Sequence, residues 1–269
     1  MDDNNRNKME RPRIKIFTRS MNPALYDRAM FFIDFPYPKV RLTRTTADGY
    51  FYKMLEDVDA DIAINIDEDA FVFNHEALKQ LIEFVIGNDY VNCGMRDGGV
   101  VDMRPYSPVV TNPYFNILNL KLIREQFSEH EIRKITDHPN FDLKAYSDSS
   151  LKMPYEICMV EPYYPFFIWL SMNFKTLYLD AEEHSDNYST MLKNHLGEPF
   201  LIHTWFSRHY YFNRFHTKRI NAVIHFCELK TGKIFNDSLS NKLRNMGWVI
   251  FTFLNTKRRK IRRWVYLKK

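Results

Sequence analysis

Three consecutive acidic residues, Asp67, Glu68 and Asp69, follow a run of apolar residues in the segment "IAINIDED". The isoleucines of that run alternate as residues on one face of a β-strand do, so the acids come directly after an expected buried strand. Carboxylates in such a place repel each other and lose hydration unless a cation lies among them. Asp67 and Asp69 share a face if the strand continues through them, and their hard oxygen ligands favour Mg²⁺ or Mn²⁺.

The same Asp-x-Asp spacing occurs twice more just upstream, at Asp57 and Asp59 and at Asp59 and Asp61. Position separates the three copies, because only residues 67–69 follow a strand. Ligands of open α/β sheets bind beyond the carboxyl ends of the strands, so this copy lies where a ligand is expected. The alternative is that residues 67–69 start a loop and cap the helix expected from Asn74, since acids are favoured before a helix.

The composition is typical of a folded intracellular protein. The chain has 269 residues, 45% hydrophobic and 16% aromatic, enough for one large domain or two small ones with a full core. Its 8 glycines argue against a glycine-rich nucleotide loop, and its three cysteines form no CxxC pair, which suits a reducing compartment. The polar N-terminus is unlike a secretory signal, and no run of roughly 18 apolar residues occurs. We therefore expect a cytosolic protein.

Strand and helix periodicities alternate over the first part of the chain, which predicts an α/β sheet with parallel strands. The expected strands are residues 13–18, 39–45, 62–66 and 89–95, and the expected helices are residues 24–33, 49–58 and 74–87. Further along, residues 112–127 are expected to form a strand and then a helix, and residues 163–180 a helix and then a strand. The polar stretch 128–152 between them is expected to be an insertion or a loop.

This order of elements, with an apolar strand that ends in Asp67-Glu68-Asp69, resembles the GT-A type of nucleotide-sugar glycosyltransferase over roughly residues 13–205. The resemblance implies a Rossmann-like fold, with a mixed but mostly parallel sheet flanked by helices. In that family the acidic triplet binds a divalent metal held by the diphosphate of the donor. By position, Asp69 would bind the metal most directly, and Asp67 would face the ribose or a metal-bound water.

The resemblance also implies residues for the nucleotide and a third metal ligand. In the family the end of the first strand holds the nucleoside, which would place Thr18 and Arg19 beside it, with Arg44 nearby. Several members supply a late histidine to the metal, and His203 in "GEPFLIHTWFSR" follows an apolar, strand-like run. Imidazole favours Mn²⁺ over Mg²⁺, and Arg208 would then meet the diphosphate, whose geometry suits a guanidinium. The alternative is a core histidine satisfied by the backbone.

The catalytic base is expected just before a helix in the second half of the chain. Many inverting members of the family carry an acidic pair there, whereas this chain has Glu161-Pro162. Glu161 is the first candidate for a base toward the acceptor hydroxyl, and Asp67 is the second residue with an expected catalytic role. Glu156 and the acids of residues 180–186 follow as candidates for the base. The alternative is that Glu161 only caps the helix.

Positive charge is concentrated at the C-terminus. The net charge of +5 becomes about −3 without residues 257–269, which hold eight basic residues and no acidic one. From residue 250 on, apolar side chains recur at helical spacing between lysines and arginines (Ile250, Phe253, Leu254, Ile261, Trp264 and Val265). We expect a catalytic domain in residues 1–245 and a basic amphipathic tail in residues 246–269 on an anionic membrane surface. A solvated tail and a nucleic-acid-binding tail are the alternatives, although no nucleic-acid partner is expected.

The expected function is metal-dependent transfer of a hexose from a nucleotide sugar, expected to be UDP-linked, to a lipid or lipid-linked saccharide. Mn²⁺ or Mg²⁺ would assist the departure of the diphosphate. The enzyme would work at the inner face of the membrane, as in bacterial surface polysaccharide or glycolipid assembly. One alternative is a sugar nucleotidyltransferase, which usually has a glycine-rich basic loop that "TRSMNPALYD" lacks. The other is a non-catalytic membrane- or RNA-binding module.

Overall fold

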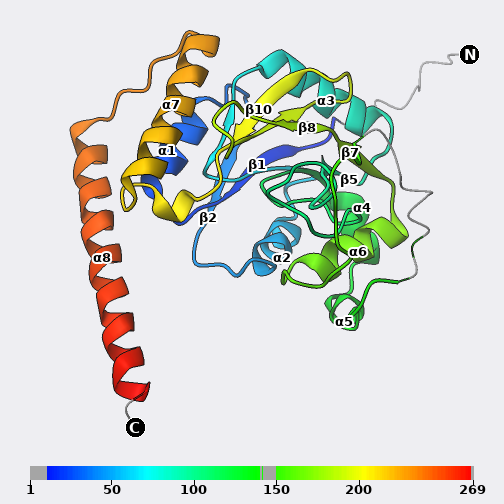
Figure 1. The fold of residues 1–269 in the computed structure, drawn as a ribbon. Helices are drawn as coiled ribbons and strands as arrows, with labels where there is room; N and C mark the ends of the chain where they lie inside the picture. Colours follow the sequence, from blue (N-terminus) through cyan, green and yellow to red (C-terminus); the bar gives the residue numbers. More distant parts are fainter. Residues whose placement is uncertain (1–10, 140, 142–149, 268–269) are drawn as a thin grey trace, which may run out of the picture.

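A computed structural model describes residues 11–139, 141 and 150–267, with side chains up to Arg258. A six-stranded sheet crosses its centre in the order β2-β1-β3-β6-β5-β7 (Figure 1). The strands are β1 (Ile14–Arg19), β2 (Lys39–Leu42), β3 (Ile62–Ile66), β5 (Asn92–Met95), β6 (Phe115–Asn119) and β7 (Thr176–Leu179). β6 is antiparallel to both of its neighbours, and every other pairing in this sheet is parallel. The prediction of a mixed but mostly parallel α/β sheet is confirmed.

A second, smaller sheet is entirely antiparallel and was not predicted from the sequence. Its order is β4-β10-β9-β8, with β4 (Ala70–Val72), β8 (Ala181–Glu183), β9 (Thr190–Lys193) and β10 (Pro199–His203). Only residues 67–69 separate β3 from β4. The chain therefore passes from the large sheet to the small one at the acidic triplet.

Helices cover both faces of the large sheet, as predicted (Figure 1). One apolar cluster joins the small sheet to α1 (Pro23–Phe31), α3 (His75–Gly87) and α7 (Arg214–Thr231). A second cluster, rich in aromatic rings, contains α2 (Gly49–Glu56), α4 (Leu120–Gln126) and α6 (Tyr164–Asn173). In the stretch expected to be an insertion or a loop, the described residues include one short helix, α5 (Glu129–Arg133), and residues 140 and 142–149 lie outside the description. The sheet is thus buried on both sides, as a mostly parallel sheet requires.

The acidic triplet does not cap α3. The side chain of Asn74 caps α3, because its Oδ1 accepts a hydrogen bond from the backbone N–H of Ala77 at 3.1 Å. β4 also lies between the triplet and this helix. The alternative that residues 67–69 cap the helix is therefore wrong.

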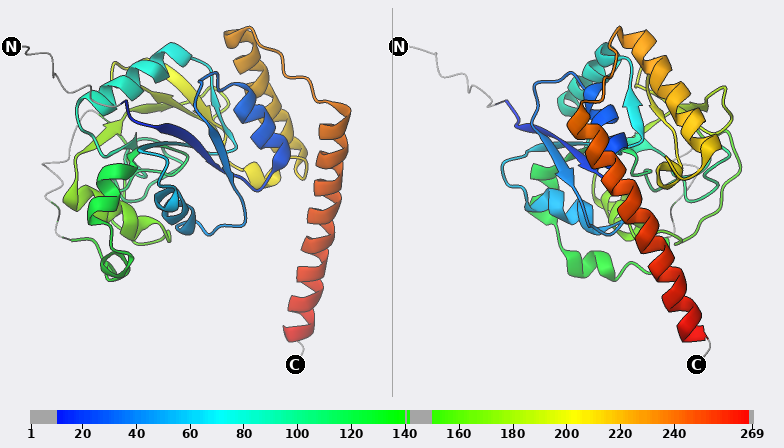
Figure 2. Two further views of the ribbon diagram at one scale, coloured as in Figure 1. Left: turned by 180° about the vertical axis from the view of Figure 1, so that it is seen from behind. Right: turned by 90° about the vertical axis from the view of Figure 1, so that its left-hand side faces the viewer.

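The last helix, α8 (Leu239–Leu267), extends well beyond the body of the molecule (Figures 1 and 2). Its start is held to α1 by two ion pairs, Arg244 with Asp27 and Arg28 with Asp237, the latter at 2.6 Å. The helix runs unbroken through residue 245, the boundary expected between the catalytic domain and the tail.

Many apolar side chains of α8 are exposed in the described part of the chain. Ile250, Phe253 and Leu254 are exposed, whereas the side chains of Ile261, Trp264 and Val265 lie outside the described residues. In the part of the chain that the structure describes, no helix combines the length and apolar character needed to cross a membrane.

Candidate functional site

The acidic triplet forms the turn that links β3 to β4. The backbone N–H of Ala70 donates to the carbonyl of Asp67 at 3.1 Å, which closes the turn. The strand ends at Ile66, as expected, so it does not continue through the triplet. Asp67 and Asp69 approach each other because the chain bends between them, and they lie beyond the carboxyl end of a parallel strand.

His203 completes a group of three possible metal ligands with Asp67 and Asp69. One ligand atom from each residue lies within 4.8 Å of those of the other two. His203 Nε2 is 3.2 Å from Asp69 Oδ1, and both side chains are buried. The contact arises because β10 pairs antiparallel with β4, with His203 opposite Ala70. A second set of bonds holds this edge, since the N–H and hydroxyl of Thr204 donate to the carbonyl of Asp69 at 2.9 and 3.0 Å.

The electrostatics of the group call for a cation. Burial and then the neighbouring charge of Asp69 raise the pKa of Asp67 well above its ordinary value, and the charge of Arg19 opposes that rise in the pKa of Asp67. Arg19 lies at the end of β1, with its guanidinium over the ring of Tyr50 at 5.5 Å. Among the described residues Arg19 is the cation that acts on Asp67, which is half-buried beside the buried Asp69, and a divalent ion would balance the remaining charge.

Two carboxylates and one imidazole suit Mn²⁺ or Mg²⁺, and the imidazole favours Mn²⁺. The buried Nδ1 of His203 has no hydrogen-bond partner among the described residues. His203 is therefore not satisfied by the backbone as a core histidine would be. Asp67, Asp69 and His203 would hold such an ion from one side and leave its other positions to a ligand.

Glu68, the middle acid, points away from this group. Its Oε2 accepts three hydrogen bonds, from the hydroxyl of Ser20 at 2.8 Å and the backbone N–H groups of Met21 and Asn22 at 2.9 and 2.6 Å. Burial raises the pKa of Glu68 to about 7 despite these bonds. The residue therefore fixes the loop between β1 and α1 against the acidic turn, a role that the sequence pattern did not indicate.

Aromatic rings enclose His203. The ring of Tyr114 stacks on the imidazole with a centroid distance of 4.3 Å, and Trp205 lies 4.1 Å away on a tilted plane. Trp205 and Phe206 both adopt left-handed backbone conformations, with φ of 53° and 59°. Such strain persists only where the surroundings hold it. Here the buried guanidinium of Arg219 on α7 donates to the carbonyl of Thr204.

The structure places the expected nucleotide residues in different surroundings. Thr18 is buried, and its hydroxyl contacts the sulfur of Met30 at 3.6 Å. Arg44 is exposed after β2 with a left-handed φ of 58°, and Arg208 is exposed in a short 3₁₀ helix (Ser207–His209). Among the described residues neither arginine forms an ion pair with the acidic triplet. Of these four residues only Arg19 acts on the triplet in the structure.

The expected base, Glu161, is half-buried just before α6. Its Oε1 lies 3.4 Å from Nη2 of Arg104. Arg104 also makes a two-point contact with the fully buried Asp97, at 2.8 and 2.7 Å. The guanidinium of Arg104 lies 5.8 Å from the ring of Trp205, so the Glu161 network borders the aromatic wall of His203. Asp97 and Arg104 were missed by the sequence reasoning, because a single Asp followed by glycines is also typical of a turn.

Two of the lower-ranked candidates for the base form ion pairs, and another is exposed. Asp180 pairs with Lys152 at 2.8 Å, and Asp186 pairs with Arg219 at 3.0 Å. Glu156 is exposed on the segment before α6.

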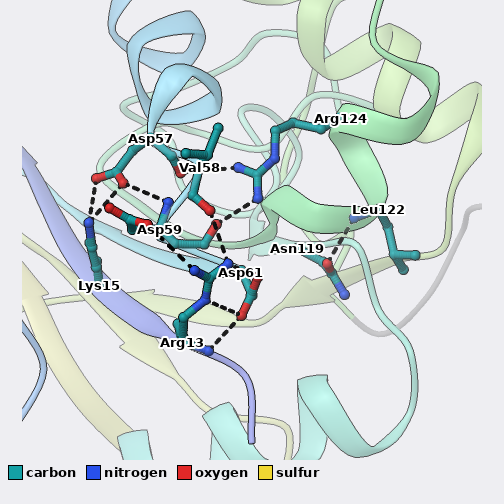
Figure 3. Close-up of polar contacts among 10 residues, drawn as sticks. Arg13, Lys15, Asp57, Val58, Asp59, Asp61, Asn119, Leu122 and Arg124 are labelled. Atoms are coloured by element: carbon teal, nitrogen blue, oxygen red, sulfur yellow. Dashed lines mark hydrogen bonds and ion pairs between the residues drawn. The ribbon is translucent and has the colours of Figure 1, made fainter. Parts of the chain in front are cut away.

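The two upstream Asp-x-Asp copies lie at the opposite end of β3 and are neutralised by the protein itself (Figure 3). Lys15 contacts both carboxylate oxygens of Asp57 at 2.8 and 2.9 Å. Asp61 accepts three hydrogen bonds from Arg13, through its backbone N–H at 2.8 Å, Nε at 3.0 Å and Nη2 at 2.9 Å. Arg124 binds backbone carbonyls of the same turn. The Asp-x-Asp carboxylates before β3 are thus paired with basic side chains of the protein, whereas those after β3 carry negative charge that the described residues balance only in part.

No protein-family model matches this chain, and no curated protein sequence matches it. Several solved structures are similar in fold. The STIV protein A197 is 13% identical, with 70% of this chain and 93% of that chain covered and a TM-score of 0.39. A glycosyltransferase involved in the glycosylation of the major capsid of PBCV-1 is 11% identical, with 58% and 89% covered and a TM-score of 0.31. The mannosyltransferase PcManGT from Pyrobaculum calidifontis, solved in complex with GDP-Man and Mn²⁺, is 8% identical, with 64% and 56% covered and a TM-score of 0.36. At such identities a likeness concerns the path of the backbone, and the chemistry rests on the residues of this chain.

Proposed function

We propose that this protein is a metal-dependent glycosyltransferase that uses a nucleotide sugar. The observation that carries the proposal is the group formed by Asp67, Asp69 and His203 beyond the carboxyl end of β3. A divalent ion there would stabilise the negative charge that develops on the leaving diphosphate. The nucleoside would lie at the end of β1, where the charge of Arg19 already lowers the pKa of Asp67. We propose a UDP-hexose as the donor.

The protein's own residues would then divide the work. Asp67 and Asp69 bind the ion, Arg19 adds positive charge near the diphosphate, and the rings of Tyr114 and Trp205 exclude water from His203. Arg44 and Arg208, both exposed, are proposed to reach the donor when it binds. Glu161 is proposed to accept the proton of the acceptor hydroxyl, with Arg104 holding its carboxylate.

The acceptor is proposed to be a lipid or a lipid-linked saccharide at the inner face of a membrane. Support comes from α8, which contains eight basic and no acidic residues. Its exposed apolar residues Leu243, Met246 and Ile250 recur at helical spacing. A helix with this composition lies in the headgroup region of an anionic membrane.

The test is calorimetric titration of UDP into the protein, once with Mn²⁺ and once with a chelator. GDP and CMP are titrated in the same way as alternative nucleotides. Asp69→Asn should abolish the metal-dependent binding. Asp59→Asn is the matched control, because it changes the same residue type at the same spacing on an exposed position. If none of the three nucleotides binds to the wild type, the transferase proposal is wrong.

A further inference from the structure

Five aromatic residues near the metal group are exposed to water. They are Tyr188, Phe206, Tyr211, Phe212 and Phe215, and together they are called the ring surface below. Phe206 is 38% exposed and Phe215 is 54% exposed. Large apolar side chains that gather at the surface in this way usually mark an interaction site.

The ring surface is held in place by its neighbours. The ring of Phe206 stacks on His216 at 4.5 Å, and Tyr188 meets Phe215 edge-on at 5.4 Å. The side chain of Asn213 caps α7 by accepting from the N–H of His216. The rings are therefore presented by an ordered loop and helix start, which lowers the entropy cost of binding.

On the segment that carries four of the five rings the charge is entirely positive, and Asp186, beside Tyr188, is paired with Arg219. Residues 199–227 contain no Asp or Glu, whereas Arg208 and Arg214 lie beside the rings and are exposed. Aromatic side chains interleaved with basic ones suit the headgroup region of an anionic membrane.

The ring surface continues into α8. The ring of Phe212 meets that of Trp248 at 5.7 Å, and both views in Figure 2 place the segment before α7 next to the first half of α8. Leu243, Met246 and Ile250 of α8 are exposed. Because residues 238–269 carry no acid, a second copy of α8 would be repelled, while an anionic bilayer would attract both segments.

We propose that the ring surface is a second membrane contact beside the metal group, and that it acts together with α8. This inference rests on the proposed function, because a membrane contact beside the metal group matters only if the acceptor is in the membrane. It adds a membrane contact for residues 204–215, which the proposed contact of α8 does not require. Phe206 is only three residues from His203, so their Cα atoms are at most about 11 Å apart. Docking of the rings would therefore bring the metal group to the bilayer surface, where a lipid-linked acceptor could enter without leaving the membrane.

The experiment is flotation of the full-length protein with vesicles of phosphatidylcholine and phosphatidylglycerol in equal amounts. The double variant Phe206→Ser/Phe215→Ser removes two exposed rings. The matched control, Leu196→Ser/Leu229→Ser, removes two apolar side chains that are 63% and 72% exposed elsewhere. We expect the ring variant to bind on the order of tenfold more weakly, and the control to bind as the wild type does.

The outcomes separate the proposals. Equal vesicle binding by the ring variant and the wild type would overturn the ring surface and leave α8 as the only contact. If poly(U) displaced the wild type and the ring variant from the vesicles equally well, and the ring substitutions had no effect on vesicle binding, the ring surface would be overturned in favour of a nucleic-acid partner. Mn²⁺-dependent UDP binding should be the same in both variants as in the wild type. The UDP assay therefore tests the transferase proposal alone, and the flotation assay tests the ring surface alone.

A second measurement does not depend on affinity. In a Cys158→Ser background, Phe215→Cys can carry a polarity-sensitive fluorophore, because Cys93 and Cys227 are buried. Its emission should shift to the blue on the anionic vesicles. An unchanged spectrum under conditions where the protein floats would also overturn the proposal.

Discussion

Asp61→Asn tests whether the upstream acids are structural while residues 67–69 are functional. Asp61 accepts its hydrogen bonds from Arg13, and that side-chain bond lowers the pKa of Asp61 from 3.8 to about 2. A shift of about 1.8 units corresponds to about 2.4 kcal/mol. The side chain of Arg13 is 56% exposed, so water screens the pair, and we expect a loss of about 1 kcal/mol.

The direction in which folding shifts the pKa of Asp61 decides how its contribution to stability changes with pH. Because folding lowers the pKa of Asp61, its contribution to stability is complete above the ordinary aspartate pKa and is lost as the pH falls through about 2. Asp61→Asn should therefore lower the free energy of unfolding by about 1 kcal/mol at neutral pH, or the Tm by about 2–4 °C. The difference between variant and wild type should shrink as the pH falls below about 4. Urea unfolding followed by circular dichroism measures both.

The comparison with Asp69→Asn makes the test two-sided. Asp69 faces His203 and the carboxylate of Asp67 and has no arginine partner among the described residues. Its replacement should abolish Mn²⁺-dependent UDP binding and should not lower stability in chelator, because it removes the charge that opposes Asp67. Loss of UDP binding in Asp61→Asn, or no loss of its stability at neutral pH, would refute this division between the two ends of β3.

Three further substitutions test single contacts. Folding raises the pKa of Glu68 to about 7, so the wild type loses stability as the pH rises from about 4.5 to 7. Glu68→Gln removes this loss and should make the protein more stable than the wild type above about pH 7, by about 3 kcal/mol. Thermal unfolding in chelator at several pH values measures the difference. Glu161→Gln should lower sugar transfer by at least about a hundredfold without changing UDP affinity, and equal losses of both would exclude it as the base. Arg219→Met removes the donor to the carbonyl of Thr204 and should weaken Mn²⁺ binding about 10–100-fold, measured by electron paramagnetic resonance.

The elements that could be predicted are those with a local signal. The alternating isoleucines of β3 and the cap at Asn74 each lie within a few residues of the element they define. His203 could be singled out through the family resemblance, because it follows an apolar run as the late histidine ligand of that family does. The small sheet could not be predicted, because the three residues of β4 carry too little pattern and gain their structure from β10, more than a hundred residues later.

The companions of the candidate ligands were hidden for a similar reason. Tyr114 and Trp205 lie in segments with many aromatic residues, and only the fold selects these two to enclose His203. Glu68 looked equivalent to its neighbours, although the bend of the chain turns it toward Ser20. A sequence pattern gives the types and spacing of side chains, whereas the direction of each in a turn depends on contacts made elsewhere.

The repulsion within the acidic turn leads to a final prediction about metal and stability. Burial and the charge of Asp69 raise the pKa of Asp67, so the metal-free folded state loses stability as the pH rises above the ordinary pKa of an aspartate. An ion that binds only the folded state should stabilise it by about 2.7 kcal/mol at a hundred times its Kd, or about 5–10 °C in Tm. Asp67→Asn should raise the Tm in chelator and lose most of the response to Mn²⁺, while the exposed Asp59→Asn should keep that response. If Asp67→Asn instead lowers the Tm in chelator as Asp61→Asn does, Asp67 is a structural carboxylate, and the turn was not built around a cation.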